Sequence, residues 1–182
     1  MKKLVLMLAL PLLALPGLGQ SRNCLRIMPV DEMTRNSSLI ARVKVRHTEK
    51  ARYQGAYSQV ALLVPVDVID GDFTLQELNV LARSNVRCAD DTYTEGQEML
   101  VFLEQEDSLF RTTNYQYGEF PIVNEIVKGW RDKSNKVIDK PYPDVRQEIV
   151  ACVNSVRNPR SDVVQTQPVQ PGRPPSTSSP NP

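Results

Sequence analysis

The sequence is poor in the residues that most enzymes use for catalysis. It has one histidine, His47, and three cysteines that lie far apart, Cys24, Cys88 and Cys152. It contains no C-x-x-C, H-E-x-x-H or G-x-S-x-G motif and no phosphate-binding glycine loop. These absences argue against a zinc enzyme, a hydrolase with a serine or cysteine nucleophile, and a nucleotide-binding enzyme. We therefore expect a protein that is not an enzyme and that holds no metal and no cofactor.

An excess of charge of one sign is also missing. The formal net charge is +1, and lysine and arginine are spread along the chain. Arg42, Lys44 and Arg46 share one face of an expected strand, but no aromatic residue alternates with them to stack on bases. We expect no nucleic-acid partner and no general attraction to anionic membranes.

Only the N-terminus carries a long apolar run. Two lysines precede the run Leu4–Leu15, and the small residues Gly17 and Gly19 follow it. This pattern predicts a cleaved signal peptide over residues 1–19, and the run is too short to span a bilayer comfortably. An uncleaved anchor and acylation of Cys24 are the alternatives. We expect a secreted or periplasmic protein with no membrane span after cleavage.

The C-terminus differs from the rest of the chain in composition. Residues 158–182 are mainly proline, serine, glutamine, threonine and arginine, and contain no aromatic residue. Such a segment buries too little apolar surface to fold, which predicts a disordered tail that is either passive or a tether. Residues 20–157 remain as one domain of ordinary length.

Most of this domain shows the period-two pattern of strands. Leu39, Ala41, Val43 and Val45 alternate with more polar residues, which predicts a strand with one solvent-exposed face. In the next strand, Pro65 indicates an edge or a bulge. Its inner face is predicted to be Val60, Leu62, Val64, Val66 and Val68. Further strands are predicted at Glu77–Val86, Met99–Leu103 and Tyr115–Val123, with shorter ones at Ile126–Trp130 and Lys136–Ile138.

Helices are predicted at both ends of the domain. Pro29–Met33 can open a short helix. Asp144 and Gln147 form a capping box for a C-terminal helix whose apolar stripe is Val145, Ile149, Cys152, Val153 and Val156. The predicted fold is mainly β: a five- to six-stranded antiparallel Greek-key barrel of the OB type, with the C-terminal helix sealing its interior.

The sequence contains candidates for a disulfide, for calcium sites and for a recognition surface. Three cysteines in an oxidising compartment favour one disulfide, with Cys24–Cys88 preferred and Cys88–Cys152 as the rival. Asp70-Gly71-Asp72 and Asp90-Asp91 lack the loop pattern of calcium sites, and we interpret them as turns. The aromatic stretch Tyr115, Tyr117, Phe120 and Trp130 serves either core packing or recognition.

The mature chain resembles the TIMP-like OB-fold superfamily, which includes netrin-type modules. The resemblance rests on a cysteine near the mature N-terminus, the strands Ser38–Val45 and Val64–Gly71, and a mid-chain cysteine before Tyr93–Leu103. It implies a Cys24–Cys88 disulfide. The metalloproteinase inhibitors of this superfamily begin with Cys-x-Cys and chelate zinc through the first residue, whereas Cys24 here is followed by Leu25-Arg26.

We therefore expect a secreted, non-enzymatic binding or structural module. Its partner is an extracellular protein or an envelope component, contacted by the open barrel face and by the loops Glu49–Tyr57 and Ala89–Gln97. The alternative is a metalloprotease inhibitor acting through its N-terminal region. A third class, an extracellular hydrolase, requires two carboxyl groups with perturbed pKa values in a concave pocket.

Overall fold

A computed structural model of the protein describes residues 25–53, 56–86, 88–132 and 134–157. The predicted signal peptide, Cys24 and the predicted tail lie outside these ranges. The fold is mainly β, as predicted. The elements are α1 (Val30–Asn36), β1 (Leu39–Tyr53), β2 (Tyr57–Asp70), β3 (Leu78–Ser84), β4 (Glu98–Glu106), β5 (Leu109–Thr112), η1 (Tyr115–Tyr117), β6 (Glu119–Val123), β7 (Ile126–Arg131), β8 (Val137–Pro141) and α2 (Tyr142–Arg157).

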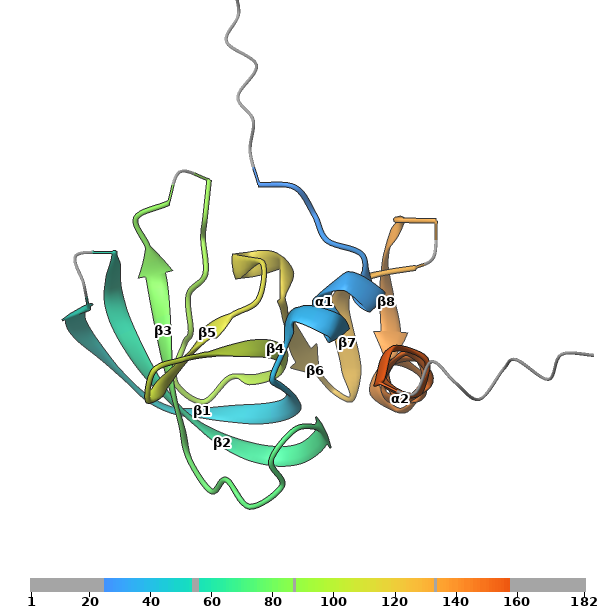
Figure 1. The fold of residues 1–182 in the computed structure, drawn as a ribbon, viewed down its shortest axis with the longest axis horizontal. Coiled ribbons are helices and arrows are strands. Elements are labelled where there is room, and N and C mark those ends of the chain that lie inside the picture. Colours follow the sequence, from blue (N-terminus) through green and yellow to red (C-terminus); the bar gives the residue numbers. More distant parts are fainter. Residues whose placement is uncertain (1–24, 54–55, 87, 133, 158–182) are drawn as a thin grey trace, which may run out of the picture.

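The eight strands form one mixed sheet in the order β1-β2-β3-β5-β4-β6-β7-β8, and β1 also pairs with β4. Five strands are thus joined in a cycle of pairings, and Figure 1 shows them curving around a common interior. The contact between β3 and β5 is parallel, whereas the other pairings are antiparallel. The prediction of five or six purely antiparallel strands was therefore too simple.

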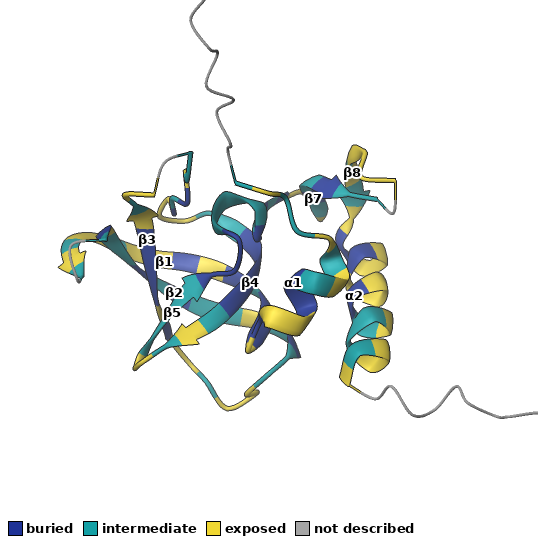
Figure 2. Cartoon of the chain, turned by 45° about the horizontal axis from the view of Figure 1, so that its top comes forward, coloured by how far each residue is buried: buried dark blue, intermediate teal, exposed yellow. Residues whose placement is uncertain are grey.

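The strands of this cycle bury side chains on both of their faces. Leu39, Ala41, Val43 and Val45 of β1 face the interior, as predicted. The opposite face of β1 is not simply exposed to water, because Ile40 is fully buried there. It belongs to a second apolar cluster, which β6, β7 and α2 complete. Figure 2 shows the buried positions gathered along β1, β3 and β4.

The inward face of β2 was predicted in the wrong phase before Pro65, whereas Val68 packs against the interior, as predicted. Ala61 and Leu63 are fully buried in the interior, while Leu62 and Val64 are only half-buried. The pairing register shifts after Pro65, where the exposed residue Val66 has no partner on β1. This is the bulge that Pro65 indicated, and the extra residue changes which positions face inward.

The segment before β6 also differs from the prediction. Tyr115–Tyr117 is a 3-10 turn rather than strand, and Asn114 before it has a left-handed backbone with φ of 62°. The strand begins only at Glu119, and the short strand β5 was not predicted. A Cβ on Gly118 would collide with the Thr113 carbonyl oxygen, so this tight turn requires glycine.

The C-terminal helix exists as predicted, but it starts and packs differently. It begins at Tyr142, so Asp144 lies in its first turn and is not the cap. Val145 and Ile149 are buried in the second cluster, and α2 also contacts α1. The helix therefore covers the outer face of the sheet and, contrary to the prediction, does not seal the interior of the five-strand cycle. No helix among the described residues has the length and apolarity needed to cross a bilayer.

Candidate functional site

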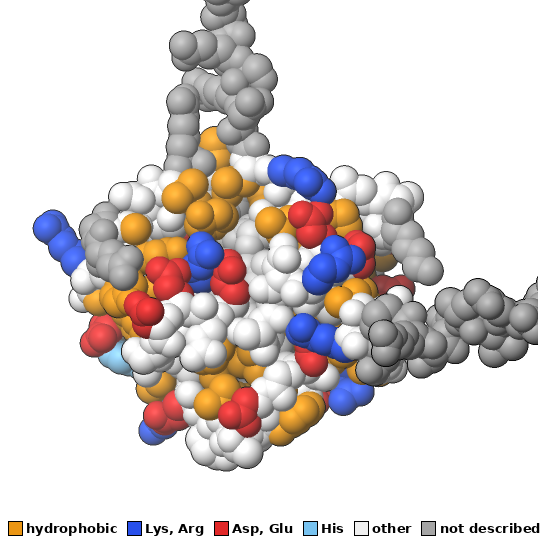
Figure 3. Space-filling model, in the orientation of Figure 1, with side chains coloured by type: hydrophobic (Ala, Val, Ile, Leu, Met, Phe, Trp, Pro, Cys, Tyr) orange, Lys and Arg blue, Asp and Glu red, His pale blue; other side chains and the backbone are white. Residues whose placement is uncertain are grey.

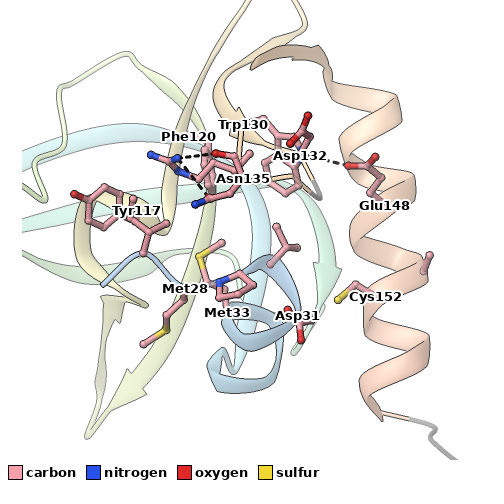
Figure 4. A pocket seen from close by; sticks show the side chains of 15 residues that line it. Met28, Asp31, Met33, Tyr117, Phe120, Trp130, Asp132, Asn135, Glu148 and Cys152 are labelled. Atoms are coloured by element: carbon pink, nitrogen blue, oxygen red, sulfur yellow. Dashed lines mark hydrogen bonds between the residues drawn. The ribbon is translucent and has the colours of Figure 1, made fainter. Parts of the chain in front are cut away.

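A hollow of about 610 Å³ opens between the N-terminal segment, α1, the β7–β8 hairpin and α2. We call it the groove. Its apolar walls include Met28 and Met33 on one side, Trp130 at the back, and Ala151 and Cys152 on α2. Figure 4 shows these walls facing one another across the opening. Hollows of this size, mainly apolar with a few polar groups, are typical of ligand sites.

The back wall of the groove is fixed by the chain's single tryptophan. Trp130 packs edge-to-face on Phe120, with ring centroids 5.1 Å apart. Its Nε1 donates a hydrogen bond to Glu148 Oε2 at 3.1 Å, and Lys140 Nζ lies 2.5 Å from Glu148 Oε1. These contacts join β7, β8 and α2, so the wall is already formed without an occupant.

The rim of the groove carries more acids than bases. Asp31 and Asp132 line its two sides, together with Glu148 and Arg131. Asp132 accepts hydrogen bonds from Ser134 and from the Lys136 N–H, and these hold the pKa of its carboxyl below the ordinary value. The guanidinium group of Arg131 donates to the Asn135 carbonyl oxygen at 3.2 Å. The ionised carboxylates favour a positively charged group at the opening.

The N-terminal wall is tied to the turn that follows β5. In the orientation that satisfies both bonds, the Asn114 amide donates to the Arg26 carbonyl oxygen at 3.0 Å and accepts from the Met28 N–H at 2.8 Å. Arg26 also pairs with Glu32 at 2.7 Å. The segment before α1 is therefore anchored to the domain.

The same turn holds the loop that contains Cys88. Gln116 donates to the Cys88 carbonyl oxygen at 2.9 Å and accepts from the Asp90 N–H at 3.0 Å. Cys24, the predicted partner of Cys88, lies outside the described residues, so this disulfide stays a prediction. The rival bond between Cys88 and Cys152 is not formed. Cys152 is half-buried on α2 in the groove wall.

A carboxylate hydrolase would require two neighbouring carboxyl groups with perturbed pKa values, and Glu119 and Asp91 are such a pair. Burial and, to a smaller extent, the nearby charge of Asp91 together raise the pKa of Glu119 to about 8. Burial also raises the pKa of Asp91, although the Ser84 N–H donates to it at 3.0 Å. Among the described atoms, Glu119 Oε2 has no hydrogen-bond partner. Neither carboxyl group lines the groove. Neither lines the two more polar hollows, one beside Arg52 and Arg83 and the other beside Pro65 and Phe73.

His47, Asp70 and Asp72 make ion pairs or hydrogen bonds with neighbouring side chains. His47 Nδ1 lies 2.8 Å from Glu95 on the surface. Asp70 pairs with Arg157 at 2.7 Å, and Asp72 accepts bonds from Thr74. Within the described ranges, no group of three or more histidine, cysteine, aspartate or glutamate side chains is placed to hold a metal ion.

The aromatic stretch and the two loops that were predicted to contact a partner lie at different hollows. Of the aromatic stretch, Phe120 and Trp130 belong to the second cluster, and Tyr117 also lines the groove. Described residues of the two predicted contact loops, among them Arg52, Ala56, Ala89 and Asp90, line a polar hollow beside the ends of β1, β2 and β3. The groove was missed because its walls come from three distant segments, none of which carries a motif. Figure 3 shows acidic and basic side chains interspersed over the face of the molecule that it draws.

Comparison with known proteins adds no relative. The chain matches no family model, and the search of curated proteins gives no match. The functional argument therefore depends on the groove and its surroundings.

Proposed function

We propose that this protein is a secreted, non-enzymatic binding module whose groove takes an apolar segment with a lysine or arginine from an extracellular protein. The observation that carries this proposal is the groove itself, with Met28, Met33 and Trp130 on its walls and carboxylates on its rim. An apolar side chain gains most by entering such a hollow. A cationic group beside it meets Asp31 and Asp132.

The rest of the chain suits a rigid support for this groove. The cycle of pairings β1-β2-β3-β5-β4-β1, with β3 and β5 parallel, supports an OB-type barrel of the TIMP-like kind. The apolar run before residue 20 supports export to the outside or to the periplasm. Binding through preformed walls keeps the ordering cost of association low.

Selection of short random peptides on the full mature chain tests the proposal. We expect selected peptides to combine apolar residues with lysine or arginine. Ala151 is exposed on α2 at the groove wall, so Ala151→Trp fills the groove without disturbing the core. Peptide affinity is expected to fall at least about tenfold in this variant.

Ser155→Trp is the matched control. Ser155 is exposed on the same helix and does not line the groove, so this variant should keep the affinity of the parent. Peptides that bind Ala151→Trp and the parent chain equally well would show that the groove is not the binding site, and failure to select any peptide would contradict the proposal.

A metalloprotease inhibitor is the second candidate. It is favoured by one observation: Asn114 and Gln116 hold the N-terminal segment and the Cys88 loop through neighbouring contacts. This brings the chain just after Cys24 close to the predicted disulfide partner. N-terminal sequencing of exported protein tests it, because chelation of a protease zinc needs Cys24 as the first residue. Any residue ahead of Cys24 excludes that mechanism.

A further inference from the structure

Two arginines differ from the other described arginines in the contacts of their guanidinium groups. Every other described arginine makes an ion pair or donates a side-chain hydrogen bond. The guanidinium groups of Arg52 and Arg83 do neither. Both side chains line one polar hollow of about 530 Å³ at the end of the barrel, between the β1–β2 tip and the loop after β3.

The strand register explains why the two arginines meet. Tyr53 pairs with Tyr57, and Tyr57 pairs with Ser84. One step along these antiparallel strands, Ser58 lies between Arg52 and Arg83, and its Oγ donates to the Arg83 carbonyl oxygen at 3.2 Å. Neighbouring strands are about 4.8 Å apart, so Arg52 and Arg83 flank Ser58 closely, and all three line the same hollow.

The backbone at Arg83 is held in an unusual conformation. Its φ of 52° is left-handed, which is uncommon for a residue with a side chain. The buried residue Asp91 fixes it from below: the Arg83 N–H donates to the Asp91 carbonyl oxygen at 2.6 Å, and the Ser84 N–H donates to its carboxylate at 3.0 Å. Strain of this kind is often maintained at binding sites.

We propose that this hollow binds a single oxyanion group, either a tetrahedral sulfate or phosphate or a planar carboxylate. Guanidinium groups form paired, charge-assisted hydrogen bonds with all of these. The site is separate from the groove and does not depend on the function proposed for it.

Hydroxyl groups and one acid complete the site. Ser84 Oγ accepts from the Val86 N–H at 3.1 Å, which leaves its own proton for a ligand. The Thr92 hydroxyl also lines the hollow and makes no described hydrogen bond. Asp90 lines the hollow too, so two positive groups face one negative group. This balance admits one anion and weakens its binding.

Amide NMR of the mature chain, titrated with sulfate, phosphate or acetate at constant ionic strength, tests the proposal. We expect saturable shifts at Ser84 and Thr92. Arg52→Gln and Arg83→Gln should each weaken binding about tenfold, and Asp90→Asn should strengthen it. Arg52 is exposed at the end of β1, so its variant remains informative if Arg83→Gln perturbs the strained turn.

Arg46→Gln is the matched control, because Arg46 is an exposed arginine of the same strand that pairs with Glu77 outside the hollow. It should leave anion binding unchanged. Preference for sulfate and phosphate identifies a tetrahedral ligand, and preference for acetate identifies a carboxylate. Shifts that do not saturate, or equal losses in Arg46→Gln and Arg52→Gln, would overturn the proposal.

Discussion

The interior of the five-strand cycle and the second apolar cluster differ in what builds them. The buried interior consists mainly of aliphatic side chains from β1 to β4, with the buried Tyr93 and the partly buried Phe110 as its described aromatic residues. The second cluster contains Phe102, Phe120, Trp130 and Tyr142, and it needs α1, α2 and the strands after β5. The groove adjoins only the second cluster. The comparison separates a ring of strands with an aliphatic interior from a flank, rich in aromatic side chains, that borders the groove.

Polar contacts attach α2 to the outer face of the sheet. Arg42 of β1 pairs with Glu98 at 2.7 Å and with Glu125 at 2.5 Å, and its guanidinium group lies 4.7 Å from the centroid of the Tyr142 ring. The Tyr142 hydroxyl donates to Asp67 at 2.8 Å. These directional contacts fix the start of α2 on the sheet, and α2 in turn supplies one wall of the groove.

The largest loss of stability is expected for a substitution in the interior of the five-strand cycle. Leu63 is fully buried there, so Leu63→Ala should lower the free energy of unfolding by about 3–5 kcal/mol. Urea denaturation followed by circular dichroism measures this loss. Leu62→Ala is the control, since Leu62 is half-buried on the opposite face of the same strand, and it should cost about 1 kcal/mol. A larger loss in Leu62→Ala would show that the phase of β2 is assigned wrongly.

A smaller and more local effect is expected in the second cluster. Ile149 is fully buried between α2 and the sheet, and Ile149→Ala should cost about 2–4 kcal/mol. If the regions are distinct, hydrogen exchange should accelerate in α2 and β7 while β1–β4 amides stay protected. Asn154→Ala, at an exposed position of α2, should change neither. Equal loss of protection in both regions would mean that they unfold as one unit.

The positions that face the interior could be predicted from the sequence in some strands and not in others. The interior positions of β1 alternate strictly along the strand, so Leu39, Ala41, Val43 and Val45 were identified by period alone, whereas β4 was predicted only as the strand Met99–Leu103. The phase of β2 was lost because a bulge at Val66 adds one residue, and period-two patterns carry no signal for such an insertion.

The groove depends on contacts that no local pattern encodes. Met33, Trp130 and Cys152 come together only because α2 docks on the outer face of the sheet. That docking relies on the contacts of Arg42 and Tyr142, residues far apart in sequence. Arg42 was interpreted as a residue of a solvated face, whereas 13% of its side chain is exposed.

The stability of the protein should depend on pH through Glu119, which lies between the two regions. Glu119 starts β6, beside Phe120 of the second cluster, and its charge acts on Tyr93 of the interior. Its folded-state pKa of about 8 lies above the ordinary 4.5, so the folded protein binds this proton more tightly than the unfolded chain. The stability it contributes is therefore full below pH 4.5 and is lost as the pH rises through 8.

Glu119→Gln removes this titration. Because water reaches part of the side chain, we expect the variant to be more stable than the parent by on the order of 2 kcal/mol at about pH 9, with little difference at about pH 4. Urea denaturation across this range measures the difference. Glu95→Gln, an exposed acid whose pKa is lowered chiefly by the Thr48 N–H, should not show this gain at high pH. A parent chain whose stability is flat from pH 5 to 9 would contradict the prediction.

The smallest effect is expected at the exposed end of the contact between α2 and β2. Arg146 Nε lies 2.7 Å from Asp67, and the two side chains are 44% and 31% exposed. Pairs in water contribute little because solvent and salt screen them, so Arg146→Gln should cost about 0.5 kcal/mol, and less in high salt. Tyr142→Phe removes a more buried hydrogen bond to the same carboxylate and should cost about 1 kcal/mol. If Arg146→Gln costs more than Tyr142→Phe, surface charge rather than buried contact holds α2 in place.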